Sequence, residues 1–497
     1  KSEPVVATQW VMGDLEKVGM LKMDFLGLRT LTVVDHTVRL VERTRGEKIQ
    51  IDELPLDDSE TYQLLQRGAA KGVFQLESEG IRSLLKRMKP DNIRDIIAIM
   101  ALYRPGPLQG GMVDSYVNRK HGKEHWTDAH EVVTEVLKET YGVMVYQEQV
   151  MRILNRLGGI DLSSAYACIK AISKKKTDII DQRKSDFIRG AQERGLTKEQ
   201  AEQIFDLIVV FGGYGFNKSH TAAYARLGYQ TAYLKRHYTP EFMAALLSSE
   251  IDDGNKRDIL IEHIEDARSL GVEVLPPDIN SSEPEFTVRD GKIVFGLTAI
   301  KGLGRSAAET ICKVRDEGGP FRSLFDFCER VDARSVSRLA VERLIKAGAF
   351  DAFGHRAALM ALLPRASQAA EEHLADRRRG QRSFFDLMNG SDSQGAAIAE
   401  PLPEVKPWTE TERLQYEKEA LDFYMSSHPL ARVEADLKRF VSHTIERARQ
   451  SDDGTEVRIG GLMTQVRYFA SKKSGKRYVR CRLEDLTGTA DCVMWPD

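Results

Sequence analysis

The sequence between residues 29 and 249 carries helical patterning almost without interruption, and this feature constrains the fold more than any other. In the stretch 29–44, for example, apolar residues recur every three or four positions, which is the spacing of one helix face. Breaks rich in glycine and proline divide the region at residues 103–107 and 211–215. Strands and helices do not alternate in a sustained way, so the pattern predicts a helical region rather than a parallel sheet covered by helices.

Capping residues mark where individual helices begin. Asp, Ser, Thr or Pro precedes or opens a helical run at residues 57–60, 90–91 and 197–200, and these residue types are favoured there. A long polar helix is expected at residues 355–379. Short apolar runs predict two strands, one at residues 18–25 and one at residues 292–296.

The chain has 497 residues, too many for one hydrophobic core, so we expect three or four domains. The helical character changes near residues 275–278, and residues 388–403 have the Gly, Ser, Ala and Pro content of a linker. The segment 456–495 alternates between apolar and polar residues, which is typical of strands. The order therefore runs from a helix-rich part to a β part.

Several classes of protein are disfavoured by the composition. No uninterrupted apolar run approaches the ~20 residues that a membrane-spanning helix needs. The five cysteines include no CxxC pair, which argues against a zinc ribbon and a disulfide framework and favours the reducing cytoplasm. The chain starts with Lys1 and nothing there resembles a signal peptide, so we expect it to begin inside a longer protein.

Positive charge is concentrated in one helical region, although the net charge of the chain is only −2. Residues 151–238 contain fifteen Lys or Arg against eight Asp or Glu. Such a surplus suggests a polyanionic partner. A solvated charged face is the alternative, and charge alone favours it.

Residues 299–304, Ala-Ile-Lys-Gly-Leu-Gly, precede a predicted helix in the pattern of a helix-hairpin-helix. The two glycines allow a tight turn and a close approach to a phosphate, and the amides of the next helix point at the anion. The alternative is a Gly-rich turn between packed helices, but phosphate binding is favoured here. A weaker copy at residues 344–350 is better explained by packing. The candidate DNA-binding residues are Lys301, Gly302, Leu303 and Gly304.

A second Gly-rich turn, at residues 211–220, combines amide donors with polar and cationic side chains. This combination suits a phosphate or a sugar, although a His beside Gly is more often structural. The candidate residues are Asn217, Lys218, Ser219 and His220.

The strands predicted within residues 456–495 fit the opening of an OB-fold, which often binds single-stranded nucleic acid through basic and aromatic side chains. Turns are expected at residues 473–476 and 486–488, so only three of the five OB strands can be placed. An ordinary charged β-meander explains the segment equally well. The residues that suit the binding role are Arg467, Tyr468, Lys472, Lys473, Lys476, Arg477, Tyr478 and Arg480.

Six segments together resemble the bacterial DNA polymerase III alpha subunits, the C-family replicative polymerases, and they occur in the order of that family. The similarity extends over essentially the whole chain. The segments are residues 22–31, 72–78, 102–108, 146–151, 213–220 and 275–280.

The resemblance implies a multidomain, mainly α-helical protein with a partial α/β palm remnant and a truncated OB-fold β-barrel. Residues 1–30 would be the end of the palm, 31–275 the helical fingers, 276–430 a clamp-binding domain with the helix-hairpin-helix, and 440–497 the OB-fold.

The implied reaction is template-directed addition of deoxynucleotides to a primer 3′ end by two-metal phosphoryl transfer. In the family, three aspartates hold two Mg²⁺ ions. Asp24 matches the third aspartate, and Lys22 matches a basic residue beside it. The other two aspartates lie in an earlier strand that this chain does not contain, so we expect the chain alone to be inactive.

Nucleotide binding is implied at two places. The family carries two adjacent arginines before a Gly-Lys-Lys run, and they reach the triphosphate. Here Ile169 and Lys170 occupy those positions, ahead of Lys174 and Lys175. Because Ile169 replaces one of these arginines, Lys170, Lys174 and Lys175 are expected to contribute more of the triphosphate contacts, although lysine cannot form the planar fork of arginine. Residues 217–220 would lie around the nucleotide sugar and phosphates.

Residues 381–385, Gln-Arg-Ser-Phe-Phe, resemble the pentapeptide of the family that docks on the sliding clamp. Gln381, Phe384 and Phe385 are the expected contacts, because aromatic anchors fill an apolar pocket while a polar residue fixes the register. The alternative is a small core beneath a loop.

The implied partners are primer-template DNA, deoxynucleoside triphosphates, the sliding clamp, the proofreading exonuclease and the clamp loader. Two alternatives remain: a translesion paralogue of the same family, and a non-catalytic module that binds DNA and the clamp. Primer extension separates the last alternative from a polymerase, because a module binds DNA without incorporating nucleotide.

Overall fold

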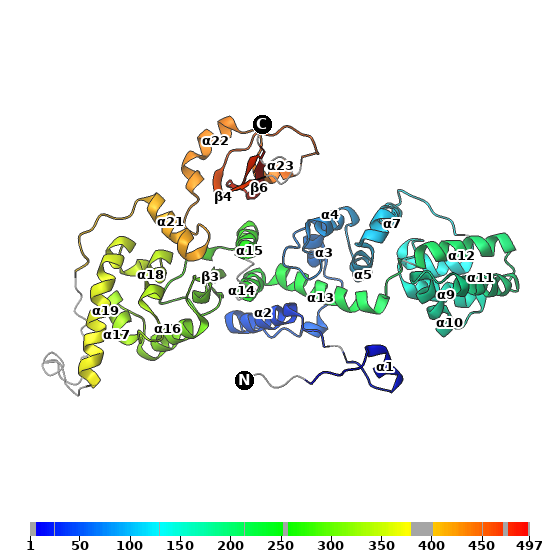
Figure 1. The fold of residues 1–497 in the computed structure, drawn as a ribbon, viewed down its shortest axis with the longest axis horizontal. Helices are drawn as coiled ribbons and strands as arrows, with labels where there is room; N and C mark the ends of the chain where they lie inside the picture. The colour runs from blue at the N-terminus through cyan, green and yellow to red at the C-terminus, as the bar shows by residue number, and fades with distance from the viewer. Residues whose placement is uncertain are drawn as a thin grey trace. The chain divides into compact units, whose positions relative to one another are not determined.

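The computed structural model describes residues 6–23, 25–128, 130–212, 214–251, 257–378, 401–449, 451–470 and 476–495. The chain divides into two compact units, Lys1–Tyr238 and Thr239–Asp497 (Figure 1). It is mainly helical and contains two small three-stranded sheets, which confirms the helix-rich order predicted from the sequence. No helix in the described ranges is both long and apolar enough to span a bilayer.

The first unit begins with the short helix α1, Met12–Lys17, and the long helix α2, Arg29–Arg45. The strand predicted at residues 18–25 is wrong over its described residues, which form no strand. A strand needs a neighbouring strand for its backbone groups. None pairs with this stretch among the described residues, and Phe25 is 93% exposed.

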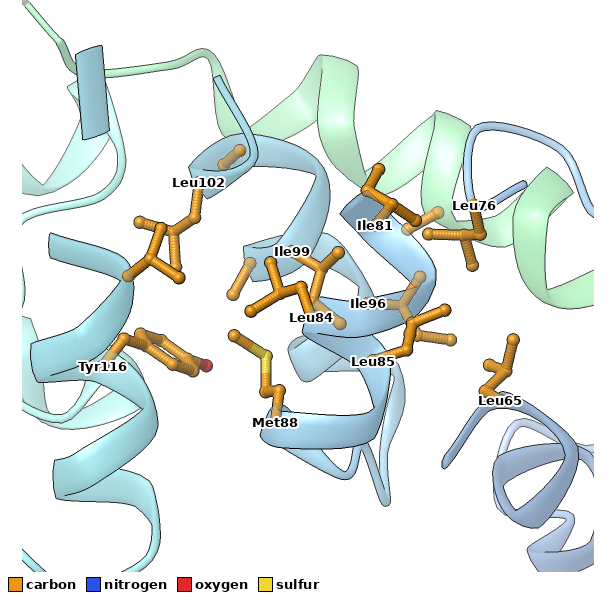
Figure 2. Packing of buried hydrophobic residues seen from close by; sticks show 14 of the residues in the cluster. Leu65, Leu76, Ile81, Leu84, Leu85, Met88, Ile96, Ile99, Leu102 and Tyr116 are labelled. Carbon is orange, nitrogen blue, oxygen red and sulfur yellow. The ribbon is translucent and has the colours of Figure 1, made fainter. Parts of the chain in front are cut away.

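One group of helices in this unit surrounds the core shown in Figure 2. Helix α3 begins where the sequence predicted, because the Asp58 side chain accepts a hydrogen bond from the Thr61 amide at 2.8 Å. Leu65, Ile99 and Leu102 are fully buried at its centre. The helices are α3 Ser59–Gln66, α4 Glu79–Met88, α5 Ile93–Leu102, α6 Pro105–Gln109, α7 Met112–Lys120 and α13 Lys218–His237.

A second group of helices in the same unit has its own core, which includes Ile153, Leu154, Phe187 and Phe205. The capping residues predicted at 197–200 open α12, where the Gln200 amide donates to the Thr197 hydroxyl at 3.2 Å. The helices are α8 Glu131–Leu137, α9 Gln147–Gly158, α10 Leu162–Ser173, α11 Thr177–Gln192 and α12 Lys198–Gly212.

The second unit opens with α14, Thr239–Glu250, and α15, Arg257–Ser269, which pack on a small sheet. The sheet has the order β1-β3-β2, with β1 parallel to β3 and β2 antiparallel to it. The strand predicted at residues 292–296 is confirmed as β3. The strands are β1 Val274–Leu275, β2 Thr287–Arg289 and β3 Lys292–Val294.

Compact helices follow the sheet, and the long helix predicted at residues 355–379 is confirmed as α19. These helices are α16 Arg305–Gly318, α17 Leu324–Arg330, α18 Arg338–Ala347, α19 Arg356–Arg378 and α21 Glu410–Leu421.

A buried carboxylate holds α21 in place. Glu417 has no exposed surface, and it accepts hydrogen bonds from the amides of Met425 at 2.8 Å and Ser426 at 2.9 Å. Its other oxygen lies 3.4 Å from Nη1 of Arg356, at the start of α19. A buried charge is tolerated when it is paired and hydrogen-bonded. The Glu417 carboxylate therefore fixes α21 against the first turn of α19.

The last part of the unit contains two short helices and an antiparallel meander. The predicted strands are confirmed, but three strands do not establish the OB-fold, which has five. The turn at residues 486–488 joins β5 to β6, while residues 471–475 of the other turn lie outside the described ranges. The elements are α22 Glu434–Phe440, α23 Ile445–Arg449, β4 Leu462–Ala470, β5 Arg477–Glu484 and β6 Thr489–Met494.

Candidate functional site

Helix α13 begins directly after the Gly-rich turn, at one of the predicted nucleotide positions. Asn217 caps the helix, because its side chain accepts a hydrogen bond from the His220 amide at 2.8 Å. The His220 ring packs against Tyr224, with 4.3 Å between ring centroids and 35° between the ring planes. Ser219 and His220 remain exposed. The capped turn therefore presents these two side chains to solvent at a fixed helix terminus.

The chain segment before α9 is tied to this turn by backbone hydrogen bonds. Tyr146 and Phe216 form an isolated parallel bridge. The Phe216 amide donates to the Val145 carbonyl at 3.1 Å, and the Gln147 amide donates to the Phe216 carbonyl at 2.9 Å. Two of the six family-like segments, 146–151 and 213–220, are therefore neighbours in the structure.

A third family-like segment, residues 102–108, reaches the same turn through Arg104. Its guanidinium donates to the Tyr214 carbonyl at 2.8 Å and lies 4.4 Å from the centroid of the Phe216 ring. Partial burial lowers the pKa of this guanidinium. Gly106 is required here, because a Cβ would be 2.3 Å from the Tyr214 ring. Three segments far apart in sequence thus build one site.

Lys218 is not free to bind an anion in this arrangement. Its Nζ contacts both carboxylate oxygens of Glu139, at 2.7 and 2.8 Å. Its amide donates to the Glu148 carboxylate at 3.0 Å. A cleft of about 700 Å³ lies beside it. Residues lining this cleft include Arg94, Lys138, Arg152 and Lys218.

The other predicted nucleotide residues lie at the end of α10, in the second helical group. Lys170, Lys174 and Lys175 are exposed, and no carboxylate pairs with them among the described residues. The Lys170 ammonium lies 4.5 Å from the centroid of the Tyr166 ring. Ile169 is only 1% exposed and belongs to the core of this group, so the position next to Lys170 offers no polar contact.

The predicted hairpin is formed by residues 300–304. Gly302 has a φ of +73°, a conformation that favours glycine, and Leu303 is buried beneath the turn. Gly304 is the N-cap of α16 and supplies no capping side chain. The Lys301 ammonium forms an ion pair with Asp422, and its amide donates to the Ala420 carbonyl at 2.9 Å.

The weaker copy of the hairpin has a structural explanation. Gly348 ends α18 with a φ of +92°. The Arg356 guanidinium covers it, because a Cβ there would be 2.2 Å from Nη2. Arg356 in turn pairs with Asp351 at 2.8 Å. This turn serves the packing of α18 against α19.

The predicted metal and clamp residues are not placed by the structure. Asp24, Gln381, Phe384 and Phe385 lie outside the described residues, and Lys22 is exposed. Within the described ranges, no three His, Cys, Asp or Glu side chains are arranged to hold a metal ion.

Sequence reasoning missed several residues of these sites. Glu139 pairs with the Lys218 ammonium, Glu148 accepts a hydrogen bond from the Lys218 amide, and Arg104 fixes the turn, but each acts on a residue far along the chain. One sequence signal pointed to two of them, since Arg104 and Glu148 lie within the family-like segments 102–108 and 146–151. No sequence pattern pointed to Glu139.

Comparison with known proteins agrees with the resemblance. Residues 30–195 match the family described as the bacterial DNA polymerase III alpha subunit finger domain, and residues 271–359 match a helix-hairpin-helix motif. The chain is 44% identical to the DNA polymerase III subunit alpha of Thermus aquaticus, over 98% of this chain and 39% of that protein. It is 40% identical to the Escherichia coli K12 protein of the same name, over 99% of this chain and 43% of that protein. The chain thus spans about two fifths of the length of these relatives.

Proposed function

The chain carries a finger domain of the bacterial DNA polymerase III alpha subunit family and a helix-hairpin-helix region, and on this premise we propose that it serves replicative, template-directed DNA synthesis. The observation that carries the proposal is the convergence of three family-like segments on the turn before α13. A fixed, solvent-facing turn in a finger domain suits recognition of an incoming deoxynucleoside triphosphate.

The triphosphate is assigned to the end of α10. Lys170, Lys174 and Lys175 are exposed cations without carboxylate partners in the described structure, so their charge is available to an anion. Ser219 and His220 are assigned to the sugar, because they are exposed at the start of α13. Asn217 and Lys218 are assigned a supporting role, since one caps the helix and the other is paired with Glu139.

The helix-hairpin-helix is assigned to DNA without sequence preference, because backbone amides can contact phosphates but do not read bases. Gln381, Phe384 and Phe385 are assigned to the sliding clamp on their sequence pattern. Asp24, with Lys22 beside it, is assigned to the two-Mg²⁺ site that a longer protein would complete.

Primer extension tests the proposal. A full-length protein that contains this chain should extend a primer, and Asp24→Asn should nearly abolish extension while leaving helical content unchanged. The 497-residue chain alone should bind primer-template DNA without extending it. Normal turnover by Asp24→Asn would remove Asp24 from the metal site. A full-length protein that binds DNA but never incorporates nucleotide would favour the non-catalytic module.

A further inference from the structure

The cations around the hairpin are almost all paired with carboxylates. Residues 300–318 and 338–347 contain seven Lys or Arg side chains, and six of them lie within 4 Å of a carboxylate oxygen. The pairs are Lys301 with Asp422, Arg305 with Glu285 at 2.7 Å, Lys313 with Glu317 at 3.9 Å, Arg315 with Asp316 at 3.2 Å, Arg338 with Glu342 at 3.5 Å and Lys346 with Glu419 at 2.8 Å.

Arg343, on α18, is the exception. Among the described residues it has no carboxylate partner, and its Nη1 donates to the neutral Lys301 carbonyl at 2.8 Å. The guanidinium lies against the hairpin itself, because Nη1 is 1.6 Å from the position that a Cβ of Gly302 would take. The absence of that Cβ is what admits the arginine. Within the described residues, the Arg343 guanidinium therefore lies against the hairpin with its charge not neutralised by a carboxylate.

The side of the hairpin at Gly304 is open. A Cβ on Gly304 would meet no atom within 4 Å, and the residue gives α16 no side-chain cap. The first amides of a helix point outward and carry partial positive charge, which favours an anion. The amides at the start of α16 and the guanidinium of Arg343 thus border the same short turn.

We propose that Arg343, which lies on α18 against this hairpin, contacts a DNA backbone phosphate together with the first amides of α16. This inference rests on the proposed DNA binding of the hairpin and changes which side chain performs it. Lys301, the cation within the motif, is engaged by Asp422, so it offers less charge to a phosphate. The ligand is a phosphodiester of duplex DNA, bound without base recognition.

Arginine suits this role because its guanidinium is planar and carries five N–H donors. The hydrogen bond to the Lys301 carbonyl uses one donor and fixes the plane of the group. The remaining donors can form the two parallel hydrogen bonds that arginine makes to phosphate. A group already oriented in the free protein loses less conformational entropy on binding.

The test measures duplex binding by the 497-residue chain as a function of salt. Arg343→Gln removes the charge and, because its side chain is shorter, also the hydrogen bond to the Lys301 carbonyl, so Arg343→Lys, which keeps the charge, is measured beside it. Arg338→Gln is the matched control, on the same helix but paired with Glu342. We expect Arg343→Gln to weaken binding several-fold and to lower the slope of log K against log salt by ~0.9. Arg338→Gln should change affinity less than twofold.

Gly304→Val separates this inference from the proposed function. If Gly304→Val weakens binding while Arg343→Gln leaves affinity and salt slope unchanged, the hairpin binds DNA and the role of Arg343 is overturned. If neither substitution has an effect, DNA binding by the hairpin fails, and the role of Arg343 fails with it. Unfolding temperatures of all variants establish that the fold is retained. If Arg343→Gln unfolds, Arg343→Lys keeps the charge and should keep the salt slope.

Discussion

At the scale of single residues, the partner of a side chain decides its role more than its type does. Lys218 and Lys170 are both lysines at predicted nucleotide positions. Lys218 is paired with Glu139 at 2.7 Å, whereas Lys170 is exposed, lies 4.5 Å from the centroid of the Tyr166 ring and has no carboxylate partner within the described ranges. The sequence predicted the positions of both, but their different electrostatic environments depend on tertiary contacts that no local pattern contains.

This difference gives a prediction for nucleotide affinity. In a full-length protein that contains this chain, Lys170→Ala should raise the apparent KM for deoxynucleoside triphosphates several-fold, since an unpaired cation near the triphosphate is lost. Lys198→Ala is the control, because Lys198 lies near Glu202 at 3.8 Å on a different helix. Steady-state primer extension at varied nucleotide concentration measures both. Equal KM values for the wild type and Lys170→Ala would contradict the assignment.

The two glycines of the hairpin are predicted to differ in what they tolerate. Gly302→Ala should lower the free energy of unfolding by about 1 kcal/mol or more, because a positive φ disfavours alanine and the new Cβ would meet Arg343. Gly304→Ala should leave stability nearly unchanged, since its φ is −72° and the space is open. Thermal unfolding of the two variants checks this. Similar losses of stability for both variants would contradict the view that only Gly302 is restricted by its backbone conformation and by Arg343.

At the scale of elements, helix α3 depends on the charge of one capping residue. Burial alone would raise the pKa of Asp58, but hydrogen bonds from Thr61 and His237 outweigh it and hold the pKa below its usual value. A depressed carboxyl pKa stabilises the fold above the unfolded pKa of ~3.9, and this stabilisation is lost as the pH falls through the folded value.

Asp58→Ala should therefore reduce the free energy of unfolding by about 1–2 kcal/mol at pH 7, as capping residues do, and the difference from wild type should shrink below about pH 4. Asp58→Asn retains a capping side chain, so it should lose less at pH 7. Urea unfolding followed by circular dichroism at pH 7 and pH 3 measures both variants. A difference that is equal at the two pH values would rule out the carboxylate charge as the cause.

At the scale of the whole molecule, the sequence predicted the helix-rich order, the hairpin and the family-like segments, because each is a local pattern. The starts of α3 and α12 followed from capping residues such as Asp58 and Thr197. The strand at residues 18–25 could not be judged locally, since an apolar run forms a strand only where a neighbour pairs with it. The convergence of Arg104 and Tyr146 on one turn also depends on contacts distant in sequence.

The clamp assignment yields a prediction for the chain as a whole. Phe384→Ala combined with Phe385→Ala should weaken binding to the cognate sliding clamp by well over tenfold, because truncation of an aromatic anchor costs ~2 kcal/mol or more. Duplex DNA binding should survive, since the hairpin lies on other elements. Titration of the clamp against wild type and variant measures the effect. If wild type and variant bind the clamp with the same affinity, residues 381–385 do not dock on the clamp, and a small core beneath a loop is the better explanation.

The number of residues in helix α19 sets the direction in which its C-terminal end points. Gln381 follows Arg378, the last residue of α19, by only three positions, and the helix has 23 residues, or ~35 Å. One residue inserted into the helix would turn its end by ~100° about the axis. Four inserted residues would bring the end back to within ~40° of its direction and move it ~6 Å outward. Any group attached rigidly to the backbone of Arg378 would therefore change its orientation periodically with helix length, while its distance from the start of the helix would grow steadily.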